Sequence, residues 1–215
     1  AMFEHKKEWD LPVVGKRTAY LTGHDELHSM SANLGVPNIR FWMGFGEHYI
    51  NVFNVLNNLG LLSEKPVRTA EGLEVVPLKV VKAVLPDPAS LAPTYTGKTC
   101  IGDLLKGTKN GKPQEVLLYN VCDHEEAYKE VGSQAISYTA GVPAVAAAML
   151  IADGVWDVSQ MVNVEELDPR PFIELMNRIG LPTRVRDARG DRDLDPFAEC
   201  PELPERETLG KVVVD

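Results

Sequence analysis

Cysteine is scarce in this chain of 215 residues: Cys100, Cys122 and Cys200 lie far apart, and none belongs to a C-x-x-C pair. Such spacing predicts neither a disulfide framework nor a metal site built on paired thiolates. Positive charge is also in short supply, because 22 Lys and Arg face 31 Asp and Glu, which gives a net charge of -9. Binding to nucleic acid would need a local cluster of positive charge, so we expect no nucleic-acid partner.

Long apolar runs are absent as well. The longest, residues 142–152, has eleven residues, whereas a helix that spans a membrane needs about 20. We therefore expect a buried helix there and no membrane partner. The N-terminal residues are mostly charged and lack the apolar core of a signal peptide, which predicts a cytoplasmic protein.

Three common catalytic and nucleotide-binding motifs are missing. A dinucleotide fingerprint needs G-x-G-x-x-G between a strand and a helix, because glycines let the backbone approach the pyrophosphate. The nearest candidate begins at Gly44 and Gly46, but Tyr49 stands where the third glycine belongs. Neither a Walker-type loop nor G-x-S-x-G occurs in the sequence.

The sequence that is present predicts an α+β fold. Residues 98–108 and 115–121 are extended runs, and Asn110-Gly111 between them is typical of a tight hairpin turn with positive φ. This hairpin indicates a mixed, largely antiparallel sheet with helices packed on it. We expect further strands at residues 17–22 and 38–45, and helices at residues 25–34, 47–59, 78–85, 142–153 and 171–179.

Charge dominates the C-terminal stretch. Of the 24 residues 184–207, 13 are charged, and Pro196, Pro201 and Pro204 interrupt the others. Such a stretch has little apolar area with which to offset the entropy lost on ordering. We therefore expect a loosely attached or extended tail over residues 186–215.

Two histidines in His24-Asp25-Glu26-Leu27-His28 share one face of a predicted helix. The zinc protease motif places glutamate directly after the first histidine, and here Asp25 holds that position. No third ligand is indicated. Asp25 as a helix N-cap accounts for the pattern more simply, and we expect no metal.

Asp123 and His124 stand where a predicted strand ends and a helix begins. Asp123 could orient the imidazole for proton transfer. Alternatively, Asp123 caps the helix and Glu126 completes a capping box, which leaves His124 as an ordinary residue of the first turn. Cys122 lacks a neighbouring cation that would lower its pKa, so we expect a small buried residue rather than a nucleophile.

Residues 133–143 are rich in hydroxyl and amide side chains, and Gly141 allows close approach of the backbone. One interpretation is a helix start near Gly141 whose backbone N–H groups bind a carboxylate, helped by Ser137 and Thr139. The other is a turn with capping hydroxyls. Sequence reasoning alone leaves both open.

These same residues belong to segments that are similar to a known family. The chain resembles the C-terminal half of the carboxynorspermidine dehydrogenases, within the wider saccharopine dehydrogenase family. The matching segments cover residues 24–27, 40–49, 58–66, 77–93, 96–102, 118–128, 134–144 and 163–174.

The resemblance implies an NADPH-dependent imine reductase of polyamine biosynthesis. A diamine would condense with L-aspartate β-semialdehyde, and reduction of the imine would give carboxynorspermidine or carboxyspermidine. It also implies an N-terminal Rossmann domain, absent from this chain, that holds NADPH, so the isolated chain is expected to be inactive. The alternatives are a domain of a saccharopine dehydrogenase of lysine metabolism, or a non-catalytic dimerisation module.

The resemblance also implies where the domain begins and ends and which residues form the site. It implies a substrate-binding and dimerisation domain over residues 16–185, preceded by a boundary segment at residues 1–15, and a homodimer as the assembly. His124 and Asp123 are the catalytic candidates. The candidates for binding the small-molecule substrate are Arg40, Glu47, Gln134, Ser137, Thr139 and Gly141.

Overall fold

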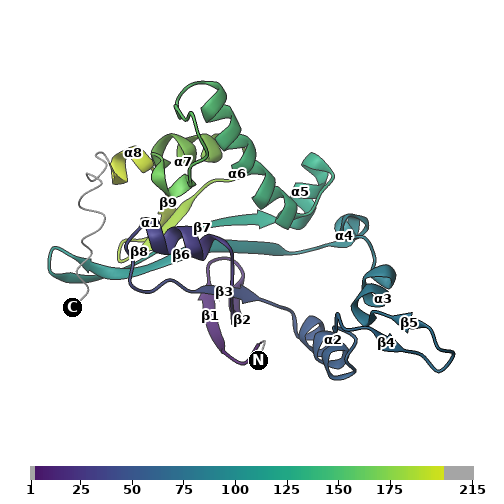
Figure 1. The fold of residues 1–215 in the computed structure, drawn as a ribbon. Helices are drawn as coiled ribbons and strands as arrows, with labels where there is room; N and C mark the ends of the chain where they lie inside the picture. The colour runs from purple at the N-terminus through teal and green to yellow at the C-terminus, as the bar shows by residue number, and fades with distance from the viewer. Residues whose placement is uncertain (1–2, 201–215) are drawn as a thin grey trace.

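The computed structural model describes residues 3–200 and shows an α+β fold (Figure 1). Its strands form sheets of three, two and four strands, and every strand pair is antiparallel. The predicted fold class is therefore confirmed. In Figure 1, the helices α5, α6 and α7 lie on one side of the long strands β6 and β7, and the three-stranded sheet lies on the other.

The three-stranded sheet has the order β1 (Lys6–Leu11), β2 (Gly15–Thr22) and β3 (Phe41–Gly44), and α1 (Glu26–Asn33) connects β2 to β3. The predicted boundary segment at residues 1–15 therefore contains a strand, whose register runs from Lys6↔Tyr20 to Leu11↔Gly15. Charged residues in β1 concealed it, because an exposed edge strand needs few apolar side chains. Phe3 adds edge-to-face ring contacts to Tyr20, Phe45 and Phe53 at 5.0–5.2 Å.

A protruding region follows the first sheet. It comprises α2 (Glu47–Asn58), the short hairpin β4 (Val67–Arg68) and β5 (Glu74–Val75), and then α3 (Pro77–Val84), α4 (Pro88–Leu91) and η1 (Ala92–Thr94). The helix predicted at residues 47–59 is confirmed, and Gly60 follows it with φ +74°. No residue of α2 is buried, although its apolar positions have helical spacing.

The four-stranded sheet begins with the predicted hairpin. Strands β6 (Lys98–Lys109) and β7 (Lys112–Asp123) are joined by Asn110 and Gly111, whose φ angles are +54° and +72°. Positive φ at both positions is typical of a type I′ turn.

Two further strands, β8 (Arg184–Asp187) and β9 (Gly190–Asp193), extend this sheet in the order β6-β7-β8-β9, and α8 (Pro196–Glu199) follows. The predicted loose tail is therefore wrong for residues 186–199; residues 201–215 lie outside the described residues. Ion pairs between Arg186 and Asp191 and between Arg192 and Asp187 use the charges within the hairpin itself.

The remaining helices are α5 (His124–Val131), α6 (Ala135–Ala152), η2 (Val164–Glu166) and α7 (Pro169–Arg178). Helices α5, α6 and α7 pack on the end of β7 around one core, which contains Cys122, Ala127, Ala135, Tyr138, Ala146, Met176 and Leu181. The short η2 instead contacts α1, where Asn33 donates a hydrogen bond to Glu165.

Helix α6 by length and composition could cross a membrane, a test that core helices of soluble proteins also pass. Its buried residues Ala135, Tyr138, Ala146 and Leu150 form one face against the core, while Ile136, Val145 and Ile151 are exposed. The expectation of a buried helix therefore holds for one face only.

Candidate functional site

A cavity of about 440 Å³ opens between α5 and α6. Its polar side is formed by Glu130, Ser133, Ser137 and Tyr138, and its apolar side by Val142, Val145, Met149 and Ile179. Gly141 lies in the lining as well. Two predicted site residues, Ser137 and Gly141, thus meet in one cavity.

Glu130 and Tyr138 form the polar end of this cavity. The Tyr138 hydroxyl donates to the Glu130 carboxylate and lies 3.1 and 3.2 Å from its two oxygens. Only 6% of Tyr138 is exposed, and burial, followed by the hydrogen bond to Glu130, raises the pKa of the phenol. A side chain at Gly180, where φ is +104°, would collide with this hydroxyl.

His124 joins the start of α5 to the start of α6. Its Nδ1 accepts a hydrogen bond of 3.2 Å from the backbone N–H of Ala135. A nitrogen that accepts carries no proton, so this bond assigns the proton of the neutral ring to Nε2. Within residues 3–200 we find no hydrogen-bond partner for Nε2. The Tyr95 ring flanks the imidazole at 5.3 Å.

Asp123 acts as the N-cap of α5. Its Oδ1 accepts from the backbone N–H groups of Glu125 and Glu126, at 2.9 and 3.2 Å, and its Oδ2 lies 3.4 Å from Lys98 Nζ. The bond from Glu126, then that from Glu125 and the contact with Lys98, hold the pKa of Asp123 below its usual value. The predicted cap is confirmed, but the carboxylate orients backbone groups rather than the imidazole. Glu126 completes no capping box, because its carboxylate pairs with Lys129.

The helix start predicted near Gly141 is wrong. Helix α6 begins at Ala135, with Gln134 as an N-cap in extended conformation, and Gly141 lies in its interior. Hydroxyl side chains at residues 137–139 resembled a turn, but Thr139 Oγ1 donates to the carbonyl of Ile136 within the helix. The unpaired backbone N–H groups of the helix start therefore belong to the turn after Gln134, near His124.

Cys122 is buried, with 8% exposure, and burial raises the pKa of its thiol. The charges of Asp123 and Glu130 act in the same direction. A thiol with a raised pKa is a poor nucleophile at neutral pH. The prediction of a small buried residue is confirmed.

Three sequence-predicted features lie outside this site. Arg40 is exposed directly before β3, and Glu47 is the exposed first residue of α2; Figure 1 shows α2 well apart from α5 and α6. His24 pairs with Glu26 and stacks on Phe41 at 4.2 Å. Within residues 3–200, no group of three or more His, Cys, Asp or Glu could hold a metal ion.

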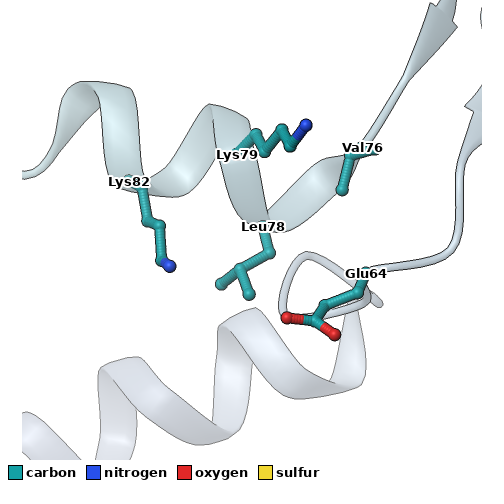
Figure 2. Close-up of a pocket in the computed structure, with 5 residues that line it drawn as sticks. All are labelled: Glu64, Val76, Leu78, Lys79 and Lys82. Atoms are coloured by element: carbon teal, nitrogen blue, oxygen red, sulfur yellow. The ribbon is translucent and has the colours of Figure 1, made fainter.

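A second, smaller hollow of about 230 Å³ lies between the end of α2 and α3 (Figure 2). It is lined by Glu64, Val76, Leu78, Lys79 and Lys82. Figure 2 shows Leu78 and the Glu64 carboxylate turned toward the gap, with the two lysines along α3. This hollow lacks the hydroxyl groups that line the cavity beside α6.

A family comparison identifies the fold. Residues 1–181 match the model of the saccharopine dehydrogenase C-terminal domain. The chain belongs to this family. Because the match begins at residue 1, the segment 1–15 is part of the saccharopine dehydrogenase C-terminal domain, in agreement with the pairing of β1.

Three relatives are similar over most of the chain. Carboxynorspermidine synthase of Vibrio alginolyticus is 49% identical over 180 residues, which cover 84% of this chain and 44% of that protein. The Vibrio cholerae carboxynorspermidine synthase is 49% identical over 81% of this chain and 42% of its own length. Carboxyaminopropylagmatine dehydrogenase of Synechocystis sp. is 44% identical, over 82% and 44%. The chain thus spans less than half the length of these relatives.

Within this saccharopine dehydrogenase C-terminal domain, sequence reasoning missed Glu130 and Tyr138. They are eight residues apart, and they meet because Gly132 ends α5 with φ +67° and lets the chain turn back into α6. The Gly132-Ser133 pair after a predicted helix was the available signal, since glycine is favoured at that position.

Proposed function

We propose that this chain is the substrate-binding and dimerisation domain of an NADPH-dependent imine reductase of polyamine biosynthesis. The full-length enzyme would join a diamine to L-aspartate β-semialdehyde and form carboxynorspermidine or carboxyspermidine. The observation that carries the proposal is the 44–49% identity to two carboxynorspermidine synthases and a carboxyaminopropylagmatine dehydrogenase along more than four fifths of this chain. We place the enzyme in the cytoplasm.

The described residues do not themselves fit a nucleotide. The chain has no G-x-G-x-x-G, and the strand pairs within residues 3–200 are all antiparallel, whereas a dinucleotide fold is built on parallel strands. NADPH would therefore bind the Rossmann domain that the family resemblance implies. We assign to this chain the residues that bind the substrates.

His124 is the group that we assign to the condensation. Its free Nε2–H donates a hydrogen bond to the aldehyde oxygen, which makes the carbonyl carbon more open to attack by the amine. The same donor holds the hydroxyl of the addition product, which takes up a proton released by the attacking amine and leaves as water when the C–O bond breaks. Because Nδ1 accepts the hydrogen bond from Ala135, Nε2 is the ring nitrogen that is left to act as the donor.

The first turn of α6 is the site that we assign to the substrate carboxylate. The N–H of Ala135 already donates to His124, so the groups that attract an anion are the backbone N–H groups of the next two residues, Ile136 and Ser137, in the helix that Gln134 caps. This assignment moves the predicted anion site from Gly141 to the turn beside His124.

Substitution of His124 in the full-length enzyme tests the proposal. Asparagine places its amide oxygen close to the position of Nδ1, so His124→Asn keeps an acceptor for Ala135 and removes Nε2. We expect kcat to fall about 10²-fold with little change in Tm, whereas His124→Ala should lower both. Near-wild-type kcat in His124→Asn would show that the residue only joins the two helices.

The alternative of a saccharopine dehydrogenase in lysine metabolism rests on the name of the family model. Steady-state assays of the full-length enzyme with 1,3-diaminopropane, putrescine and L-lysine separate the two. The proposal requires higher kcat/KM for a diamine, and a preference for L-lysine would replace it with the alternative.

The isolated chain should form a homodimer and should not bind NADPH tightly. Exposed apolar residues at the end of α6 and directly after it, such as Ile151 and Val155, supply surface that a second copy would cover. Sedimentation that shows only a 23.7 kDa species at micromolar concentration would contradict the dimer. Calorimetry with a micromolar Kd for NADPH would contradict the absence of a nucleotide site.

A further inference from the structure

The carboxylate of Glu130 stands at the cavity beside α6 without a counter-ion. Among residues 3–200, no Lys, Arg or His side chain forms an ion pair with it, and its partner is the neutral Tyr138 hydroxyl. The residues that line the cavity include no Lys or Arg. Glu130 is exposed at the rim of the cavity, so a cation can approach this uncompensated negative charge from solvent.

We propose that this cavity binds the amine substrate, with Glu130 as the counter-ion of the terminal ammonium group of an α,ω-diamine. The inference rests on the proposed function and deepens it, because it names the residue that selects the amine. It also replaces the acidic candidate Glu47, which lies on the separate helix α2.

Tyr138 fixes the position of the carboxylate. Its ring belongs to the core, and its hydroxyl contacts both Glu130 oxygens. Gly180 leaves the space that the hydroxyl fills. One phenol proton satisfies only part of the capacity of two carboxylate oxygens, so acceptor positions remain for the three N–H donors of an ammonium group.

The walls of the cavity suit the rest of a diamine. Val142, Val145 and Met149 lie at successive turns of α6, and Ile179 faces them. Such a surface covers methylene groups. The Ser133 and Ser137 hydroxyls, also in the lining, can accept further ammonium N–H bonds.

The same charges disfavour an amino acid as the occupant. The carboxylate of L-lysine would enter a cavity that already holds Glu130 and whose lining lacks a cationic side chain. Like charges at close range repel, and solvent weakens this repulsion where a carboxylate is exposed, as Glu130 is. The cavity thus favours an amine without a carboxylate.

Calorimetric titration of the full-length protein with 1,3-diaminopropane tests the inference directly. Glu130→Gln keeps an acceptor for Tyr138 but removes the charge, so we expect Kd to rise about 10- to 100-fold. In assays, KM for the diamine should rise similarly, with KM for the aldehyde and kcat at saturating diamine close to wild type. Glu126→Gln is the matched control and should change neither value, because Glu126 lies one turn earlier on the same helix, pairs with Lys129 and does not line the cavity.

A second variant covers the case in which Glu130→Gln is unstable. Gly141 lines the cavity with open space around it, so Gly141→Leu should fill the cavity without unfolding α6 and should weaken diamine binding as well. Equal diamine affinity in wild type and both variants, or tighter binding of L-lysine than of the diamine, would overturn the inference. Wild-type protein that binds diamines through Glu130 but reduces no imine would refute the proposed function alone.

Discussion

Two regions of the molecule use apolar residues in opposite ways. Helices α6 and α7, over the end of β7, enclose a core that includes Tyr138, Leu181 and Met176. In α2, by contrast, no residue is buried: Val55 is 57% exposed, and Leu59 at the C-cap of this helix is 69% exposed. Apolar periodicity therefore predicts which face of a helix will be covered, but the covering surface need not come from the same chain.

The largest expected difference between these regions is the loss of unfolding free energy when a leucine in each is shortened to alanine. Leu181 is 2% exposed, so Leu181→Ala leaves a cavity and should lower the free energy of unfolding by about 2–5 kcal/mol. Leu59→Ala should change it by less than about 0.5 kcal/mol in the isolated chain. Urea unfolding followed by circular dichroism measures both. A comparable loss for Leu59→Ala would show that α2 is covered after all, for example in a dimer.

Two glycines on β6 sharpen the comparison within one strand. A Cβ at Gly102 would collide with the Leu118 carbonyl oxygen and with Tyr119, whereas one at Gly107 meets open space. Gly102→Ala should therefore cost about 1–3 kcal/mol through forced separation of β6 and β7. Gly107→Ala, near the exposed hairpin tip, should be almost neutral. Equal unfolding midpoints for the two variants would contradict the packing described for the base of the hairpin.

Alanine substitutions at the N-cap positions of α5 and α1 should differ less strongly, in their effect on Tm. Asp123 accepts two backbone N–H bonds at the start of α5, while Asp25 precedes α1 without a side-chain cap bond. We expect Asp123→Ala to lower Tm by about 2–4 °C, and Asp25→Ala to leave it unchanged. Thermal melts of the two variants and the wild type are sufficient. A matching fall in Asp25→Ala would mean that its side chain caps α1 in solution.

The smallest expected effect is on how Tm depends on pH in the acid range. Hydrogen bonds from Arg189 and Arg192 hold the pKa of Asp187 below its unfolded value, which is about 3.9. The stability that this carboxylate contributes is complete above the unfolded pKa and is lost as pH falls through the folded pKa. Tm measured between pH 6 and 2 should therefore fall less in Asp187→Asn than in wild type, and the two curves should converge at low pH. Parallel curves would contradict the role of Asp187 in the β8–β9 hairpin.

Local signals predicted the elements that local interactions hold. Asn110-Gly111 fixed the turn of the long hairpin, because positive φ at two successive residues is a property of those residues themselves. Asp123 was predicted as a cap for the same reason. The antiparallel sheet followed from the hairpin.

Elements that depend on distant partners were mispredicted. Helix α6 starts seven residues before the predicted position, and the N–H of its first residue is satisfied by His124, eleven residues away. Strands β8 and β9 are so rich in charge that composition indicated a tail, yet Arg186 and Asp191 neutralise each other across the hairpin. Glu130 was missed because its place in the cavity is set by the turn at Gly132 and not by its own neighbours in sequence.

The fit of Gly180 against the Tyr138 hydroxyl also has an evolutionary consequence. If a single base change replaced Gly180 by another residue, the new side chain would collide with the Tyr138 hydroxyl oxygen. The positive φ at this position would disfavour the same replacement. Lineages that lose the glycine should therefore be found where position 138 has already become phenylalanine or a smaller residue. Replacement of Tyr138 by phenylalanine also removes the hydroxyl that holds Glu130. Relatives that lack Gly180 should therefore differ in their amine substrate.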